Sequence, residues 1–123
     1  MQRHHTVCAA AALLAAAVLT PARSWAHAFL DHATPRVGST VHESPDAVTL
    51  AFTEPIEPDF CRVEILDAHD HRVDSGPIEH PTATELRVAL PALPQSEYTV
   101  HWTVISVDTH QTEGRFTFTF AAP

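Results

Sequence analysis

The stretch "YTVHWTVISVDTHQTEGRFTFTF", residues 98–120, contains two alternating segments on either side of a short polar loop. Apolar side chains recur at every second position of both segments: Tyr98, Val100, Trp102 and Val104 before the loop, and Phe116, Phe118 and Phe120 after it. Strict alternation is the pattern of a β-strand with one buried face. Residues 106–114 between the segments are mostly polar and end in Gly114. The stretch therefore predicts a long β-hairpin with one face in the core.

The same period of two continues on the N-terminal side of this hairpin. It is found in three further segments: Val48, Leu50 and Phe52; Cys61, Val63 and Ile65; and Leu86, Val88 and Leu90. The opening residues 27–33 and a short piece at 72–74 bring the number of expected strands to seven. Pro, Gly, Asp and Ser separate them, and no helical period is found after residue 26. The sequence predicts an all-β, seven-stranded Greek-key sandwich or barrel, similar in layout to an immunoglobulin domain.

The first 26 residues follow a different pattern. Arg3 precedes an apolar run over residues 7–19, and Ser24-Trp25-Ala26 provides the small residues of a cleavage site. This is the organisation of a secretory signal peptide. The apolar run is shorter than the roughly 20 residues that span a bilayer. We expect cleavage after Ala26, an exported domain over residues 27–123 and no stable membrane insertion afterwards; an uncleaved anchor is the alternative.

Charge and sulfur content limit the partners of this domain. The chain carries 15 acidic residues and seven basic ones, a formal charge of −8. Arg3 and Arg23 lie in the expected signal, which leaves five arginines against 15 acids. Such a surface repels phosphates and argues against nucleic acid. Cys61 is the single cysteine after residue 26, so we expect no internal disulfide, and the one methionine is Met1.

Cleavage after Ala26 would make His27 the first residue, with a free α-amino group beside its imidazole. The two nitrogens form a chelate for one metal ion. Asp108 and His110 lie two apart in the hairpin loop, and extended backbone would point both side chains to one side. On spacing alone, a turn hydrogen bond to Asp108 with an incidental histidine fits equally well. His27 favours the metal interpretation, because together these groups supply the nitrogen and oxygen donors that Cu(II) prefers.

The other residues with metal-binding side chains are expected to have ordinary roles. Four histidines lie in polar, turn-like surroundings and are expected to be solvated: His42, His69, His71 and His80. His101 falls on the outward phase of its strand, and His32 is expected to be a bystander although it lies near the new N-terminus. Cys61 falls on an inward phase and is expected to be a buried structural thiol.

Three parts of the sequence resemble the CopC family of periplasmic copper-resistance proteins. They are "HAFLDHATPRVGSTV" at residues 27–41, "VTLAFTEPIEPDF" at 48–60 and the hairpin over 98–120; the likeness covers residues 27–120. It implies a seven-stranded Greek-key β-barrel similar in shape to cupredoxins, and Cu(II) ligands at His27, Asp108 and His110. Glu54 matches a family acid near the copper, as a weak ligand or a residue behind the ligands. A surface glutamate at a strand edge is the other interpretation of Glu54.

The resemblance also implies a function and a departure from one branch of the family. It implies a periplasmic Cu(II) carrier or sequestering protein in copper resistance and homeostasis, which is not an enzyme. Such a protein either passes copper to an inner-membrane permease of the CopD type or simply holds it. Some family members carry a methionine-rich segment for Cu(I), whereas residues 67–86 here contain no methionine. Two alternatives are a copper-dependent oxidative enzyme of the N-terminal-histidine monooxygenase type and a metal-free immunoglobulin-like structural module. An aspartate ligand and a small domain count against the monooxygenase.

Overall fold

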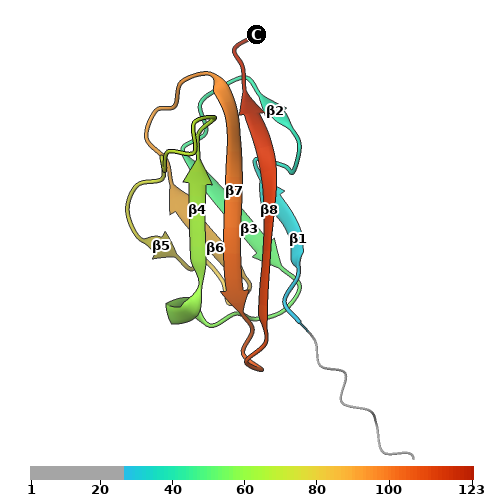
Figure 1. The fold of residues 1–123 in the computed structure, drawn as a ribbon. Coiled ribbons are helices and arrows are strands. Elements are labelled where there is room, and N and C mark those ends of the chain that lie inside the picture. Colours follow the sequence, from blue (N-terminus) through green and yellow to red (C-terminus); the bar gives the residue numbers. More distant parts are fainter. Residues whose placement is uncertain (1–26) are drawn as a thin grey trace, which may run out of the picture.

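The computed structural model describes residues 27–123, which form two facing four-stranded β-sheets (Figure 1). One sheet has the order β1-β3-β6-β5, with bounds Leu30–Thr34, Ala47–Phe52, Glu85–Ala89 and Ile78–Glu79. The other has the order β2-β8-β7-β4, with bounds Thr40–Val41, Gln111–Phe120, Ser96–Ile105 and Arg62–Leu66. A single turn of 3₁₀ helix, η1, spans Pro58–Phe60. The all-β class is confirmed, and the architecture is a sandwich.

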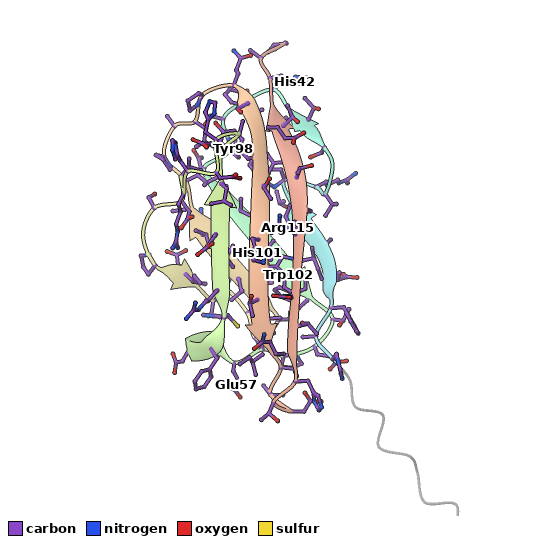
Figure 2. All side chains as sticks on the ribbon, viewed as in Figure 1. His42, Glu57, Tyr98, His101, Trp102 and Arg115 are labelled. Atoms are coloured by element: carbon purple, nitrogen blue, oxygen red, sulfur yellow. The ribbon has the colours of Figure 1, made fainter. Side chains whose placement is uncertain are left out.

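The alternating residues face inward as their spacing predicts. Fully or nearly buried members of the core include Val48, Leu50, Val63, Ile65, Leu86, Val88, Val100, Val104 and Phe118. Aromatic pairs join strands within and between the sheets. The rings of Tyr98 and Phe118 stack with centroids 5.5 Å apart, and Phe52 of one sheet meets Trp102 of the other edge-on at 5.2 Å. Figure 2 shows Tyr98 and Trp102 near opposite ends of β7.

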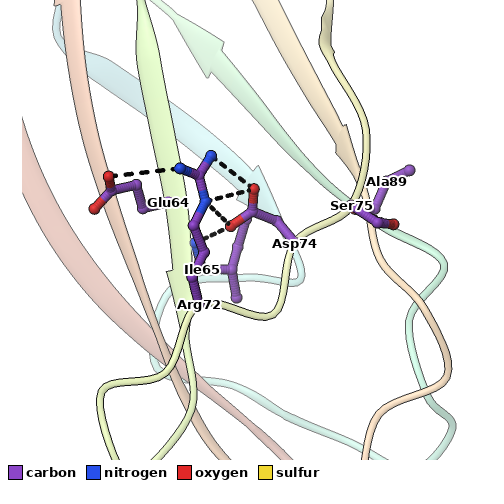
Figure 3. A network of polar contacts seen from close by, with 6 residues as sticks. All are labelled: Glu64, Ile65, Arg72, Asp74, Ser75 and Ala89. Atoms are coloured by element: carbon purple, nitrogen blue, oxygen red, sulfur yellow. Dashed lines mark hydrogen bonds and ion pairs between the residues drawn. The ribbon is translucent and has the colours of Figure 1, made fainter.

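The short strands of the structure differ from those that the sequence predicts. β2 and β5 contain two residues each, too few for an alternation to be visible. The predicted piece at 72–74 is not a strand; Arg72 makes only an isolated bridge to Leu66. The carboxylate of Asp74 takes the place of a backbone acceptor there, because it accepts the Ile65 N–H at 3.0 Å (Figure 3).

An ion pair holds this irregular connection against β4. A guanidinium nitrogen of Arg72 lies 2.9 Å from Asp74, whose side chain is 2 % exposed, and another lies 3.8 Å from Glu64 (Figure 3). The neighbouring carboxylate Asp74 raises the pKa of Arg72 above its usual value. The side-chain network thus replaces a regular ladder between residues 72–74 and β4.

One end of the sandwich gathers the segments that the sequence analysis singled out. The hairpin loop between β7 and β8, the start of β1, the end of β3 and η1 all lie at the end opposite the C-terminus (Figure 1). We call this the site end and define it as residues 27–29, 53–62 and 105–111. The expected signal peptide, residues 1–26, lies outside the described residues. Within residues 27–123, no helix is long and apolar enough to cross a membrane.

Candidate metal centre

Residues 106–110 form a tight turn, not the extended segment that the spacing argument assumed. The Ser106 N–H donates to the carbonyl of His110 at 3.0 Å, and the Thr109 N–H donates to the carbonyl of Ser106 at 2.8 Å. Thr109 adopts a φ of 73°, a conformation that a β-branched residue rarely takes. The turn still brings the two polar side chains together, since His110 Nδ1 lies 3.4 Å from Asp108 Oδ1.

The hydroxyl group of Ser106 occupies the centre of this turn. Ser106 is 1 % exposed, so its side chain lies in the core. Its hydroxyl donates to Asp108 Oδ1, lies 3.2 Å from the carbonyl of His110 and accepts the His110 N–H at 3.3 Å. The hydrogen bond from Ser106, followed by the interaction with His110, lowers the pKa of Asp108 below its usual value despite partial desolvation. Asp108 is therefore held as a carboxylate and oriented before any metal arrives.

Side-chain hydroxyls also fix the segment that carries His27. Ala28 is fully buried, and its carbonyl accepts a hydrogen bond from the Thr112 hydroxyl on β8. The Phe29 N–H donates to Thr53 Oγ1 at 3.0 Å, and the Thr53 N–H donates back to the carbonyl of Phe29 at 2.9 Å. The buried methyl group and these bonds place His27 at the edge of the site end.

The structure brings three of the four predicted ligand residues together. The imidazole of His27 stacks on that of His110 with ring centroids 4.6 Å apart and planes 18° apart. His110 in turn lies against the Asp108 carboxylate. The side chains of His27, Asp108 and His110 therefore form one continuous group from two segments more than 80 residues apart in the sequence.

The backbone of Glu54 lies between two residues that are bonded to the segments carrying this group. Its neighbour Thr53 is bonded to the N-terminal segment, with Oγ1 3.5 Å from the carbonyl of His27. Its other neighbour, Pro55, accepts the N–H of Val107 from the hairpin loop at 3.1 Å. Glu54 is half-buried, and its backbone is thus connected to both the N-terminal segment and the loop. This position fits a residue beside the ligands.

The side chains alone do not complete a metal centre. Within residues 27–123, no three His, Cys, Asp or Glu side chains are arranged to hold a metal ion. The donor set inferred from the sequence includes the α-amino nitrogen of His27, which exists only if the chain begins at that residue. The proposed centre thus depends on cleavage after Ala26.

The remaining histidines lie elsewhere. His80 directly follows the edge strand β5 and is half-buried, so it is less exposed than the sequence predicts. His42 is exposed near the opposite end, where its Nδ1 lies 2.9 Å from the carbonyl of Ala121 (Figure 2). His69 and His71 are exposed in the turn after β4, and His32 bonds to its neighbour Asp31 at 2.8 Å. His101 lies on the outer face of β7, opposite Arg115 of β8 (Figure 2). The structure places none of these side chains with His27.

Cys61 is buried, as its inward phase predicts. Its thiol donates to the carbonyl of Glu57 at 3.0 Å, and burial raises its pKa above the usual value. A thiol with a raised pKa is a poor metal ligand at neutral pH, because the thiolate is the binding form.

Sequence reasoning missed the residues that hold the ligands. The sequence pattern places residue 106 at the start of the loop and assigns no role to Ser106, Thr53 or Thr112. A serine two residues before an aspartate in a loop is a signal for a turn. Nothing in the sequence indicates that Thr112 reaches Ala28, because the two are brought together only by the packing of β1 and β8 segments.

Comparison with known proteins places the chain among copper proteins. The family model of the CopC domain matches residues 30–121. Protein YobA of Escherichia coli K12 is 34 % identical over 112 residues, which cover 89 % of this chain and 90 % of YobA. The copper transport protein CutJ of Bacillus subtilis is 29 % identical over 112 residues, which cover 86 % of this chain but 20 % of CutJ.

Solved structures agree with this assignment. CopC from Methylosinus trichosporium OB3b superposes with a TM-score of 0.71 at 32 % identity, covering 78 % of this chain and 95 % of that one. PcoC from Escherichia coli, described as a methionine-rich copper resistance protein, superposes with a TM-score of 0.70 at 25 % identity and covers 78 % and 100 % of the two chains.

Proposed function

Because the chain belongs to the CopC family of copper resistance and transport proteins, we propose that it is a periplasmic protein that carries or sequesters Cu(II) at its site end. Proteins of this family bind copper and are generally not enzymes. The observation that carries the proposal is the stack of His27 on His110, with Asp108 held against His110. Copper is the cargo of the protein.

The donor types favour Cu(II) over Cu(I). An amine, two imidazoles and a carboxylate are the nitrogen and oxygen ligands that suit Cu(II), whereas Cu(I) prefers thiolate and thioether sulfur. PcoC is described as methionine-rich, but this chain has one methionine, Met1. Its single cysteine after residue 26 is buried and used in a hydrogen bond to Glu57. We expect strong binding of one Cu(II) and weak binding of Cu(I).

A membrane transporter is the partner that we propose. The match to CutJ covers only 20 % of that protein, so in CutJ a region similar to this chain is part of a much longer copper transport protein. Two functions that are joined in one polypeptide in one organism are often carried by two interacting proteins in another. This supports delivery of copper to a separate permease of the CopD type.

Competition titration of the protein beginning at His27 tests the function. We expect one Cu(II) per chain, and His110→Ala should weaken binding by more than the 10- to 100-fold that is typical of changes behind the ligands. His42→Ala, a change of the same kind at the opposite end, should leave the affinity unchanged. Equal affinities for wild type and His110→Ala would overturn the proposed centre.

Processing has its own test. The intact mass and the first residue of the protein purified from the periplasm should correspond to a chain that begins at His27. Any other first residue would remove the chelate and with it the proposed ligand set.

Retention of one Cu(I) against a Cu(I)-specific chelator would contradict the proposed oxidation state.

A further inference from the structure

Exposed large apolar side chains gather at the site end. Four such residues are found among residues 27–123: Phe29, Val37, Phe60 and Val107, with 57 %, 57 %, 64 % and 55 % of each exposed. Scattered exposed apolar residues are ordinary, whereas a group around a functional site indicates a contact surface. Three of these four belong to the site end; Val37 is the exception.

Backbone hydrogen bonds place the three residues around one segment, residues 53–60. Phe60 is the last residue of this segment. The N–H of Val107 donates to the carbonyl of Pro55 at 3.1 Å, and the carbonyl of Phe29 accepts the N–H of Thr53 at 2.9 Å. Phe29, Val107 and Phe60, which we call the apolar rim, are therefore attached along a single strand-to-helix connection beside the candidate ligands.

A hollow lies next to the rim. It has a volume of about 450 Å³, and its lining combines the apolar Phe60 and Ile105 with the polar side chains of Asp59, Arg62, Thr103 and Gln111. Gln111 directly follows the candidate ligand His110. The hollow is thus large enough to accept a side chain of another protein, and it lies close to the metal centre in the sequence.

The charge of the site end restricts the partner. Its ionisable residues outside the histidines are Glu54, Glu57, Asp59, Cys61, Arg62 and Asp108. The four carboxylates and one arginine give a net charge of −3, which a bound Cu(II) would reduce to −1. A second copy of this chain would bring the same carboxylates into contact, and anionic lipid headgroups would also be repelled. A protein face with lysine or arginine around an apolar side chain is complementary.

We infer that the apolar rim and the adjacent hollow form the docking surface for the protein that exchanges copper with this chain, and that this partner presents a basic face with an apolar side chain that enters the hollow. The inference rests on the proposed function and adds to it the surface at which the partner binds. Copper would then pass at the centre of a contact from which water is excluded. Aromatic residues at the middle of an interface commonly supply most of its binding free energy.

Binding to the CopD-type permease of the same organism, solubilised in detergent, tests this inference. Phe60→Ala should weaken binding of the copper-loaded protein by roughly 30-fold or more, the loss typical of an interface hot spot. Val107→Ala and Val37→Ala form a matched pair, because the two valines have the same exposure at different places. The first should weaken binding, and the second should not. Asp59→Asn should weaken binding and reduce its dependence on salt.

Cu(II) affinity measured on every variant separates this inference from the proposed function. If Phe60→Ala and Val107→Ala keep the Cu(II) affinity of wild type but lose the permease, the docking surface is supported. If they bind the permease as tightly as wild type does, the docking surface is wrong while delivery stands. If wild type binds Cu(II) but not the permease, the docking surface is also wrong, and the protein sequesters copper.

Discussion

Ser106 holds two of the candidate ligands through one hydroxyl group. The group lies in the core, donates to the Asp108 carboxylate and contacts both the N–H and the carbonyl of His110. A buried polar group that is fully bonded fixes its partners, and removing it leaves them without that support. Ser106 is therefore expected to act on copper through the positions of Asp108 and His110.

Ser106→Ala should weaken Cu(II) binding roughly 10- to 100-fold, as is typical when a group behind the ligands is removed. Ser106→Thr keeps the hydroxyl and should recover most of the affinity. The electron paramagnetic resonance spectrum of the Cu(II) form should change for alanine and return towards that of wild type for threonine. A spectrum and affinity for Ser106→Ala equal to those of wild type would show that the turn holds its ligands without the hydroxyl.

Residue chemistry made part of the site predictable. His27, Asp108 and His110 were proposed from their donor atoms and from the position of the expected cleavage site, and the structure brings their side chains together. The geometric reason given for Asp108 and His110 was wrong, because the loop is a tight turn with Thr109 at positive φ. Turn type depends on hydrogen bonds such as those of Ser106, which spacing does not reveal.

At the scale of the elements, the hairpin of β7 and β8 depends on a glycine. Trp102 and Gly114 are opposite one another in the ladder, and a Cβ added at Gly114 would lie 2.6 Å from Trp102 Cζ2. The indole is also packed edge-on against Phe52 of the other sheet. The indole therefore occupies the space that a side chain at position 114 would need.

Gly114→Ala should lower the free energy of unfolding by about 1–3 kcal/mol, the usual effect of overpacking. For a domain of about this size, each kcal/mol lowers the Tm by about 4–8 °C. Thermal unfolding followed by circular dichroism measures the change. Thr119→Ala, on the same strand but away from Trp102, is the control and should have a small effect. An unchanged Tm for Gly114→Ala would mean that the Trp102 side chain does not pack against Gly114 of β8.

The turn after β4 is held by a carboxylate. Asp67 Oδ1 accepts the N–H groups of His69 at 2.8 Å and His71 at 2.9 Å. The hydrogen bond from His71, opposed by desolvation and aided by His69, lowers the pKa of Asp67 below its usual value. The ionised form is therefore favoured in the folded state.

This lowered pKa predicts a pH dependence with a definite sign. The stability contributed by ionised Asp67 is complete above the ordinary aspartate pKa of about 3.9 and is lost as the pH falls through the lower pKa of the folded state. Asp67→Asn keeps an oxygen acceptor but does not titrate. The difference in free energy of unfolding between wild type and Asp67→Asn should be present near pH 5 and should shrink as the pH falls below about 4. A difference that grew in acid would contradict the assignment.

For the whole molecule, the sequence predicts the sandwich but not its edges. Alternation over residues 98–104 and 115–120 identifies both long strands, because each has one face in the core and one towards solvent. The two-residue strands β2 and β5 carry no such pattern, and residues 72–74 are paired partly through the Asp74 carboxylate. Edge pairing of this kind is decided by tertiary packing and by side-chain hydrogen bonds.

The charge of the whole molecule is consistent with a carrier of a cation. The chain is formally −8, and its carboxylates outnumber arginines at the site end. A negative potential attracts Cu(II) and raises its rate of arrival, and this effect is screened by salt. The same charge directs a basic partner to the docking surface.

The central claim is that Cu(II) is bound by the α-amino and ring nitrogens of His27 together with Asp108 and His110. Cu(II) competition titration of two proteins tests it most directly: one begins at His27, and the other carries one glycine before His27. The added glycine should lower the affinity by more than the 10- to 100-fold that is typical of changes behind the ligands, because the chelate is lost. It should also alter the electron paramagnetic resonance spectrum. Equal affinities and identical spectra would contradict it.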